Sequence, residues 1–293
     1  MQNLNVQFPF SKVSLTQQPF GLRVQCVLDA GLIKESSYVT GLAIEATGGM
    51  EPYFGLSAFS KGVIKDFGRS LGGFLGKVDK QNGTIALYWG TNDVTSYQSL
   101  GFRSASEWDF FQFGRPALGF GRRGNLLSVL RYFLDDEHLS ARQTTRQSEG
   151  IFIFLLDGAL DDYPGVLDFL SQFASDVAND RKKRSNVILV GFGENFIEAS
   201  QGQLHALAAL SNRTSPPIIS SLTVQNTQNL IENVKDAVMV YIKTSRSGAI
   251  FNGSNQLIQD YPTGVPGAFQ FYLPPGSKSF MLNLDGVLYT QTV

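Results

Sequence analysis

Hydrophobic and polar positions follow different patterns in three parts of the chain. In residues 1–38 and 246–293, apolar and polar residues alternate in short runs separated by Gly, Pro and Asn, which is typical of half-buried antiparallel strands. Residues 39–245 instead contain unbroken apolar runs that alternate with segments of helical period. We therefore predict N-terminal β strands (1–38), a central α/β domain (39–245) and C-terminal β strands (246–293) that pair with the N-terminal ones in an accessory β layer.

The central region predicts a doubly wound, mostly parallel sheet flanked by helices. Apolar runs without alternation, typical of strands buried on both faces, lie at 39–46, 84–89, 151–156 and 187–191. Helical periodicity lies at 56–78, 126–134, 166–177, 203–210 and 230–242. Strands that alternate with helices indicate βα units with right-handed crossovers. The fold class is therefore α/β, with a β-sandwich added by the two ends of the chain.

Polar residues gather where the predicted strands end, which is where ligands bind in open α/β sheets. Glu45–Met50 leaves the first central strand, Gly121–Leu126 opens a helix, and Asp157–Gly158 leaves the most apolar strand. These segments together resemble the metal-ion-dependent adhesion site (MIDAS) of von Willebrand factor A (VWA) domains. In that family the first loop reads Asp-x-Ser-x-Ser, a Thr stands in a Gly-x-Thr-Asn-Leu turn, and an Asp precedes Gly in the third segment.

The resemblance covers roughly residues 39–245, with a VWA/Rossmann-like fold implied, but the metal site is degenerate. Glu45 stands in place of the first Asp, Thr47 in place of the first Ser, and Asp157 matches the third segment. Gly49 and Gly124 stand where the family has hydroxyl side chains. Because Mg²⁺ demands near-ideal octahedral coordination by oxygen, the resemblance implies a weak or lost site and either no cofactor or weakly bound Mg²⁺.

The segment 48–54 also resembles a turn in the VWA branch of bacterial tellurium-resistance and stress clusters. This resemblance implies a bacterial stress-response protein that binds other proteins, as in a multi-subunit complex. We expect the partner to contact the loops at the carboxyl ends of the strands, through Met50, Tyr53, Arg122, Arg123 and Asp161.

Composition excludes several other functions. Lys and Arg number 24 against 25 Asp and Glu, so no strong positive field attracts nucleic acid. The single cysteine, Cys26, allows neither an intrachain disulfide nor a cysteine zinc site. No apolar run is long enough to span a membrane, and the first residues lack the pattern of a secretory signal, so we predict a cytoplasmic protein. With no catalytic constellation, the favoured function is a non-catalytic protein–protein interaction module.

Several alternatives remain open. Gly119–Gly124 matches the G-x-G-x-x-G string, so one alternative is a nucleotide- or phosphate-binding Rossmann-like enzyme. The string lies mid-sheet, however, and not directly after the first strand of a βαβ unit as that fingerprint requires. Another is a structural subunit that forms homo-oligomers through its strand-rich ends. A second alignment of the metal motif begins at Asp29. We also expect Asp161 and Asp162 to cap the helix that follows them, and Trp108–Phe113 to lie in an irregular loop as an exposed patch.

Overall fold

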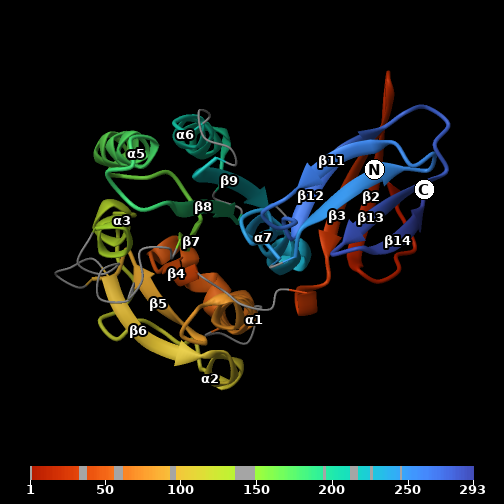
Figure 1. Cartoon of the computed structure of the whole chain (residues 1–293). Helices are drawn as coiled ribbons and strands as arrows, with labels where there is room; N and C mark the ends of the chain where they lie inside the picture. Colours follow the sequence, from red (N-terminus) through yellow and green to blue (C-terminus); the bar gives the residue numbers. More distant parts are fainter. Residues whose placement is uncertain are drawn as a thin grey trace. The chain divides into compact units, whose positions relative to one another are not determined.

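The structure, a computed structural model, describes residues 2–32, 38–55, 62–92, 97–135, 149–193, 196–211, 217–224, 227–244 and 246–293. The chain divides into two compact units. Ser36–Lys235 forms an α/β unit, and Met1–Glu35 together with Asp236–Val293 forms a β unit. Both ends of the chain therefore belong to the same unit (Figure 1).

The α/β unit is built on a six-stranded sheet with the order β6-β5-β4-β7-β8-β9. Its strands are β4 (Tyr38–Glu45), β5 (Gly83–Trp89), β6 (Tyr97–Ser104), β7 (Glu149–Leu156), β8 (Ser185–Phe192) and β9 (Ile219–Val224). Neighbouring strands are parallel except β5 and β6, which are antiparallel. The chain winds outward from β4 to β6 and later outward from β7 to β9, so the strand order reverses between β4 and β7. The predicted doubly wound α/β fold is confirmed.

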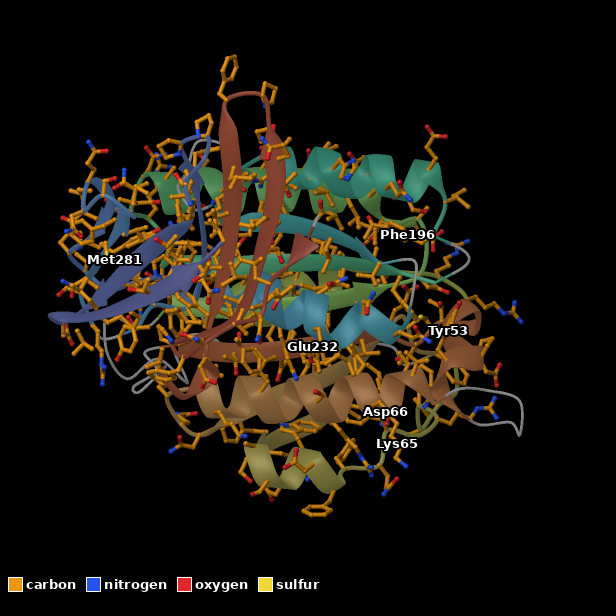
Figure 2. All side chains as sticks on the ribbon, turned by 90° about the vertical axis from the view of Figure 1, so that its right-hand side faces the viewer. Tyr53, Lys65, Asp66, Phe196, Glu232 and Met281 are labelled. Atoms are coloured by element: carbon orange, nitrogen blue, oxygen red, sulfur yellow. The ribbon has the colours of Figure 1, made fainter. Side chains whose placement is uncertain are left out.

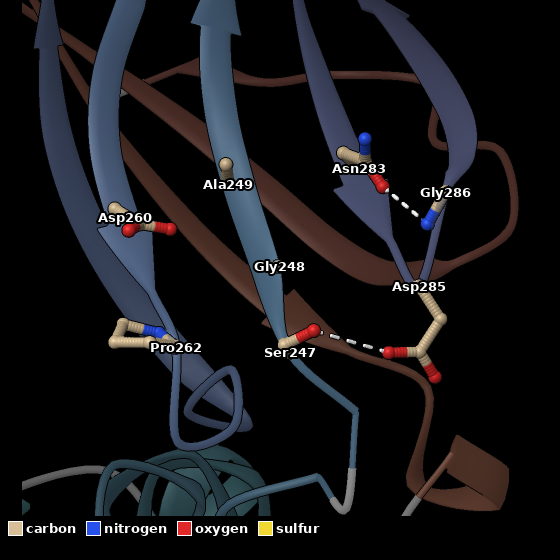
Figure 3. A pocket seen from close by; sticks show the side chains of 8 residues that line it. All are labelled: Ser247, Gly248, Ala249, Asp260, Pro262, Asn283, Asp285 and Gly286. Atoms are coloured by element: carbon tan, nitrogen blue, oxygen red, sulfur yellow. Dashed lines mark hydrogen bonds between the residues drawn. The ribbon is translucent and has the colours of Figure 1, made fainter.

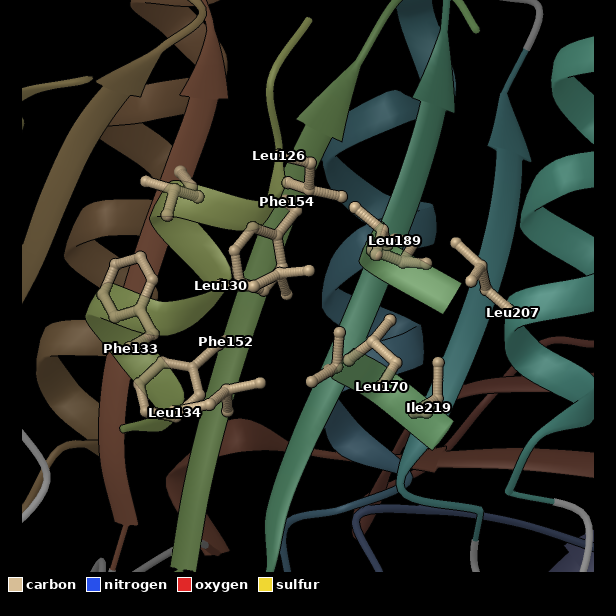
Figure 4. Close-up of a cluster of buried hydrophobic side chains, with 14 of the residues drawn as sticks. Leu126, Leu130, Phe133, Leu134, Phe152, Phe154, Leu170, Leu189, Leu207 and Ile219 are labelled. Carbon is tan, nitrogen blue, oxygen red and sulfur yellow. The ribbon is translucent and has the colours of Figure 1, made fainter. Parts of the chain in front are cut away.

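Helices lie on both faces of this sheet. On one face are α3 (Leu127–Leu134), α5 (Tyr163–Ala178) and α6 (Glu198–Ala209), and on the other is α1 (Val63–Val78) (Figure 1). Figure 4 shows the apolar cluster between the sheet and helices α3, α5 and α6. This cluster includes Phe133, Phe152, Leu170, Leu189 and Leu207. Every residue of β4, β5 and β8 is buried, which explains why these strands form unbroken apolar runs in the sequence.

Glycines along α1 allow one element to pack closely on it. A Cβ added at Gly72 would lie 2.7 Å from the Trp108 ring, and a Cβ at Gly68 would overlap the ring of Phe113. Trp108 belongs to α2 (Ala105–Phe110), and both rings are buried. The predicted exposed patch at Trp108–Phe113 is therefore wrong for these two residues, whereas Phe110 is 80% exposed. The sequence pattern hides this burial because the contact comes from a distant helix.

The β unit consists of two antiparallel sheets that share one apolar core. One has the order β1-β2-β3-β12 and the other β11-β10-β13-β14. The first comprises β1 (Gln2–Asn3), β2 (Phe10–Gln18), β3 (Gly21–Leu28) and β12 (Ala268–Leu273). The second comprises β10 (Gly248–Asn252), β11 (Leu257–Tyr261), β13 (Ser279–Leu284) and β14 (Val287–Thr292). Side chains from both sheets, among them Val24 and Phe280, pack into the same cluster, so the predicted sandwich of terminal strands is confirmed.

The pairing of β3 with β12 joins the two ends of the chain. Asp29 directly follows β3, and its carboxylate accepts a hydrogen bond from the Gly31 amide at 2.8 Å. Because β3 belongs to the antiparallel sandwich and not to the wound sheet, the alternative metal motif starting at Asp29 is wrong.

The remaining elements of the described residues are short helices and α7, which the pattern predicted at 230–242. The helices are η1 (Ala30–Leu32), η2 (Gly48–Phe54), η3 (Thr227–Asn229) and α7 (Leu230–Met239). The pattern missed β6, α2 and β9. The pattern predicted that the helix ending at Val78 begins at residue 56. Residues 56–61 lie outside the described part of the chain. No helix among the described residues has the length and apolar character needed to cross a membrane.

Candidate functional site

The parallel strands of the wound sheet end at the same level. Glu45 pairs with Trp89 of β5, Ile44 with Leu155 of β7, and Leu156 with Gly191 of β8. The segments that follow β4, β5 and β7 therefore leave the sheet at one edge. The strand order reverses between β4 and β7, and in doubly wound sheets such a reversal opens a crevice for ligands.

Backbone hydrogen bonds join the segment after β4 to the end of β5 and to the turn around Gly121. The amide of Ala46 donates to the Trp89 carbonyl at 2.7 Å, that of Gly48 to Gly121 at 2.9 Å, and that of Gly121 to Ala46 at 3.0 Å. A Cβ at Gly121 would overlap the Gly90 carbonyl oxygen, so the two backbones cross at a distance that only glycine permits. We call residues 46–49, 121–125 and 157–161 the rim.

Beneath the rim lies a buried pair of carboxyl groups, Glu45 and Asp157, which are 5% and 4% exposed. Glu45 Oε1 accepts a hydrogen bond from the Thr47 hydroxyl at 3.0 Å, and Oε2 accepts one from the Asp157 amide at 2.9 Å. Burial, followed by the charge of Asp157 and a hydrogen bond between the two side chains, raises the pKa of Glu45 to about 8. The two bonds from Thr47 and the Asp157 amide oppose this shift. At neutral pH the pair therefore retains one proton.

This donor set does not fit a tight Mg²⁺ site. A Cβ at Gly124 would lie 3.2 Å from Glu45 Oε1, so position 124 faces the carboxyl pair without supplying a hydroxyl ligand. Gly49 likewise contributes no side chain. The described part of the chain holds no group of three or more His, Cys, Asp or Glu side chains that could bind a metal ion. With one donor each, two carboxyl groups and one hydroxyl leave half of an octahedral shell unfilled.

Two adjoining hollows open at the rim. The first, about 370 Å³, is lined among others by Glu45, Thr47, Gly49, Arg122, Gly124, Asp157 and Asp161. The second, about 340 Å³, shares Arg122 and Asp161 with the first and adds Thr91, Asn92, Arg123, Asn125 and Asp162. The structure therefore brings together all the site residues that the sequence suggested, except Met50 and Tyr53.

Met50 and Tyr53 lie away from the hollows. Met50 is 0% exposed, so the prediction that its side chain contacts a partner is wrong for this structure. The half-buried Tyr53 ring packs edge-on against Phe192 at the end of β8, with 4.7 Å between ring centroids. Figure 2 shows Tyr53 and Phe196 at the same end of the α/β unit.

Asp161 and Asp162 accept hydrogen bonds from backbone amides at 124–127. Asp161 Oδ2 accepts from the Gly124 amide at 2.7 Å. The Asp162 carboxylate accepts from the amides of Leu126 and Leu127, at 3.2 and 2.7 Å. Their predicted capping of the helix that follows is wrong: neither side chain caps α5, and Asp162 caps the start of α3 instead. These bonds fix residues 161 and 162 to the turn at 124–127.

The glycines of the Gly119–Gly124 turn use their amides within the protein. Gly119 donates to the Pro116 carbonyl at 2.9 Å, Gly121 to Ala46 at 3.0 Å, and Gly124 to Asp161 at 2.7 Å. A glycine-rich loop binds phosphate through free amides that point at the ligand. These three amides are already engaged, so the turn is not arranged to hold a phosphate.

The sequence reasoning overlooked Thr91 and Asn92. Thr91 is 7% exposed and pairs with Phe120 in a short antiparallel bridge, which brings the segment after β5 to the rim. A signal was present, because the predicted strand ending at Trp89 places the next residues at the same carboxyl edge as Glu45.

A larger hollow of about 440 Å³ lies in the β unit (Figure 3). Its polar groups bond to each other across turns: the Ser247 hydroxyl donates to Asp285 at 3.3 Å, and the Gly286 amide donates to the Asn283 side chain at 2.7 Å. These contacts engage Ser247, Asn283 and Asp285 within the β unit. We therefore place the candidate site at the rim, despite its smaller hollows.

Comparison with known proteins finds distant structural likeness only. No protein-family model and no curated protein matches the sequence. The pilus adhesin SpaC from Lactobacillus rhamnosus GG, in its open conformation, is similar with a TM-score of 0.47 and 10% identity over 96% of this chain and 42% of that one. Proximal thread matrix protein 1 from the mussel byssus is similar with a TM-score of 0.48 and 11% identity over 74% of this chain and 50% of that one.

Another structure of the mussel protein, with a zinc-occupied MIDAS motif, has a TM-score of 0.46 and 13% identity over 74% of this chain and 50% of that one. The chain spans half or less of the length of the protein in each of these three structures. Likeness at this level transfers no function, which must be inferred from the rim itself.

Proposed function

We propose that the chain is a non-catalytic module that binds another protein through the rim of its α/β unit. The convergence of three distant segments at the reversal of strand order carries this proposal. Around the buried pair, Gly48, Arg122, Arg123 and Ala159 are exposed and available to a partner. Because backbone bonds already fix the segments, a partner meets a preformed surface and little ordering entropy is lost on binding.

In this proposal the Glu45–Asp157 pair has a structural role. It joins the segment after β4 to the segment after β7 by way of a shared proton, in a position where the VWA resemblance implies a metal ion. Mg²⁺ binds at this site weakly or not at all, and docking does not depend on it. The pair thus maintains the shape of the rim from below.

A nucleotide-binding enzyme is the weaker alternative. Its support was the glycine string at 119–124, whose three glycine amides bond within the protein. His205 lies exposed on α6 and not at the rim, so it offers no base to the carboxyl pair there. The alternative of a structural subunit depends on exposed strand edges in the β unit.

The broader setting also remains a proposal. We also propose that residues 39–245 form a VWA-like domain and that residues 1–38 and 246–293 form accessory strands. This proposal applies a resemblance in short motifs to whole domains. A bacterial stress or tellurium-resistance role, a cytoplasmic location and membership of a multi-subunit complex stay predictions from the sequence.

Photo-crosslinking from a single introduced cysteine tests the docking function. Cys26 is buried and burial raises its thiol pKa, so a maleimide crosslinker reacts selectively with a new exposed cysteine. Ala159→Cys places the crosslinker at the first hollow. Ala178→Cys, at the exposed end of α5 that leads into the start of β8, places it at the opposite edge of the sheet. We expect a specific partner, from an extract of the source cells, to crosslink at Ala159→Cys and not at Ala178→Cys.

Two controls complete the experiment. Excess unlabelled wild-type protein must compete with the crosslink, and EDTA must leave it unchanged because docking needs no metal. Equal capture from both positions, or none from Ala159→Cys, would contradict docking at the rim. Loss of capture in EDTA would still support docking at the rim, but it would show that docking there requires a bound metal ion.

A further inference from the structure

The sheet β11-β10-β13-β14 of the β unit has two outer edges that differ in character. On one edge, a bulge between Ile250 and Phe251 interrupts the pairing of β10 with β11, and β11 carries the exposed Asp260. Bulges and charged side chains are the means by which natural sheets keep an edge from pairing with another chain. On the other edge, β14 pairs with β13 in an uninterrupted register and contains no charged residue and no proline. Of these two edges, β14 is the one without such protection.

The turn before β14 determines which of its backbone groups face outward. Residues 285–286 form a two-residue turn with positive φ at both positions, 49° and 87°, as in a type I′ hairpin. Leu284 and Val287 close this turn as a hydrogen-bonded pair, and bonded and non-bonded pairs then alternate along the strands. In agreement, the Val293 amide donates to the Lys278 carbonyl at 2.9 Å. The odd-numbered residues of β14 therefore bond to β13, and the even-numbered ones direct their amides and carbonyls away from it.

These outward groups belong to Leu288, Thr290 and Thr292. In the part of the chain that the structure describes, no other strand pairs with them, and the Gln291 side chain donates to the Thr292 carbonyl at 2.9 Å. The three side chains are exposed, and Leu288 is 56% exposed beside Val287 at 51%. The edge thus presents free backbone groups together with two exposed aliphatic side chains.

Residues 5–8 contact β14 through its inward-facing side chains. The Gln291 side chain donates to the Asn5 carbonyl at 3.1 Å, and the Phe8 ring packs edge-on against Tyr289, with 5.5 Å between centroids. Both contacts involve odd-numbered residues of β14. The even-numbered residues at the edge are therefore left accessible.

From these observations we propose that two copies of this chain associate through β14, which pairs antiparallel with the β14 of the second copy about a two-fold axis at Thr290. Two such strands form hydrogen bonds only in a register that sets even-numbered residues opposite each other. A register centred on Thr290 meets this condition and uses the backbone of Leu288 and Thr292 as well. The inference is independent of docking at the rim, which belongs to the other unit of the chain.

This register also provides suitable side-chain neighbours. Val287 faces Val293 of the second copy, Leu288 faces Thr292, and Thr290 faces its own equivalent. Pairs of aliphatic and β-branched side chains stabilise antiparallel strands, and no like charges are placed opposite each other. The formal net charge of −1 adds little repulsion between copies. A second copy therefore supplies partners both for the outward backbone groups and for the exposed aliphatic side chains.

The pairing is closed, because a two-fold axis uses the β14 edge of both copies at once. The bulge and Asp260 on β11 protect the far edge of the sheet in each copy. Association through this sheet should therefore stop at a dimer and not continue into a filament. One strand pair is a small interface, so the dimer should be weak and dependent on concentration.

Sedimentation velocity of the whole chain, from about 5 to about 200 μM, tests the proposal. We expect wild type to shift from monomer to dimer within this range. Thr290→Lys and Thr290→Glu each place two like charges opposite each other at the axis, so each should weaken the dimer at least about tenfold. An equimolar mixture of the two variants places Lys opposite Glu and should restore a dimer that contains one copy of each.

The matched control is Leu257→Lys, which introduces the same charge at a 59% exposed residue on the opposite edge of the same sheet. It should dimerise as wild type does. The proposal is overturned if wild type stays monomeric over the whole range, if either single Thr290 variant dimerises as well as wild type, or if Leu257→Lys weakens the dimer equally. It is also overturned if mixing the two variants restores no dimer, since residue 290 then does not face its own equivalent.

Discussion

Glu45 carries an unusual protonation state for a residue at the end of a buried strand. Its carboxyl group is desolvated beside Asp157, so the pKa rises from an ordinary 4.5 to about 8. Between these two values the folded protein holds a proton that the unfolded chain releases. The resulting stabilisation is complete below about pH 4.5 and is lost as the pH rises through about 8.

Replacement of Glu45 by Gln should remove this pH dependence. The amide can donate to Asp157 in place of the proton and cannot ionise. We expect the free energy of unfolding of wild type to fall, relative to Glu45→Gln, by about 1–3 kcal/mol between pH 5 and pH 8. Urea denaturation at several pH values measures the difference.

Glu51→Gln is the matched control, since Glu51 lies exposed in the same segment. It should leave the pH dependence of wild type unchanged. If wild type and Glu45→Gln show the same slope of stability against pH, the shared proton does not exist in the folded protein.

Single residues also show how far a sequence can define a site. The order and spacing of Glu45, Gly124 and Asp157 predicted their convergence, because parallel strands end at one edge. The burial of Met50 and the capping of α3 by Asp162 were not predictable. Both depend on where η2 and the start of α3 come to lie in three dimensions, and local spacing carries no signal for that.

At the scale of elements, the glycines of α1 are explained by the neighbour they accept. Helix propensity alone disfavours glycine there, yet Gly68, Gly72 and Gly76 recur every four residues on one face. Their missing side chains admit Phe113, Trp108 and Ala105. The glycines therefore lower the intrinsic helix propensity of α1, but they allow two large aromatic rings to be buried against it.

This account predicts opposite effects for two glycine-to-alanine changes. Gly72→Ala should destabilise the protein by about 1–3 kcal/mol, because the new methyl group meets the Trp108 ring. Gly202→Ala, in α6 with nothing within 4 Å of the added Cβ, should stabilise it by about 0.5–1 kcal/mol. Denaturant midpoints give both values. If Gly72→Ala proves as stable as Gly202→Ala, α1 and α2 do not pack as described.

The elements that the sequence pattern missed lie at the edges of the wound sheet. β6 has no fully buried residue and contains Gln, Ser, Gly and Arg, so it lacks the apolar run that identified the central strands. β9, the opposite edge, is buried only at its two ends. Edge strands are held by hydrogen bonds to one neighbour, and their side-chain pattern carries a weaker signal than that of strands covered on both faces.

At the scale of the whole molecule, the β unit offers the main competing surface. β11 and β14 are the outer strands of one sheet, and Leu257, Val287 and Leu288 on them are more than half exposed. Unpaired strand edges readily add a strand from another chain, so this sheet is where a structural subunit would assemble. A protein-binding module would thus bind its partner through the α/β unit, whereas a structural subunit would assemble through the β unit.

Amide hydrogen–deuterium exchange on the complex with the captured partner distinguishes these surfaces most directly. Docking at the rim predicts slower exchange, relative to the free protein, in peptides that cover 46–49, 121–125 and 157–161, with 257–261 and 287–292 unchanged. Slower exchange confined to the strands at 257–261 and 287–292, with the rim unchanged, would contradict the proposed function.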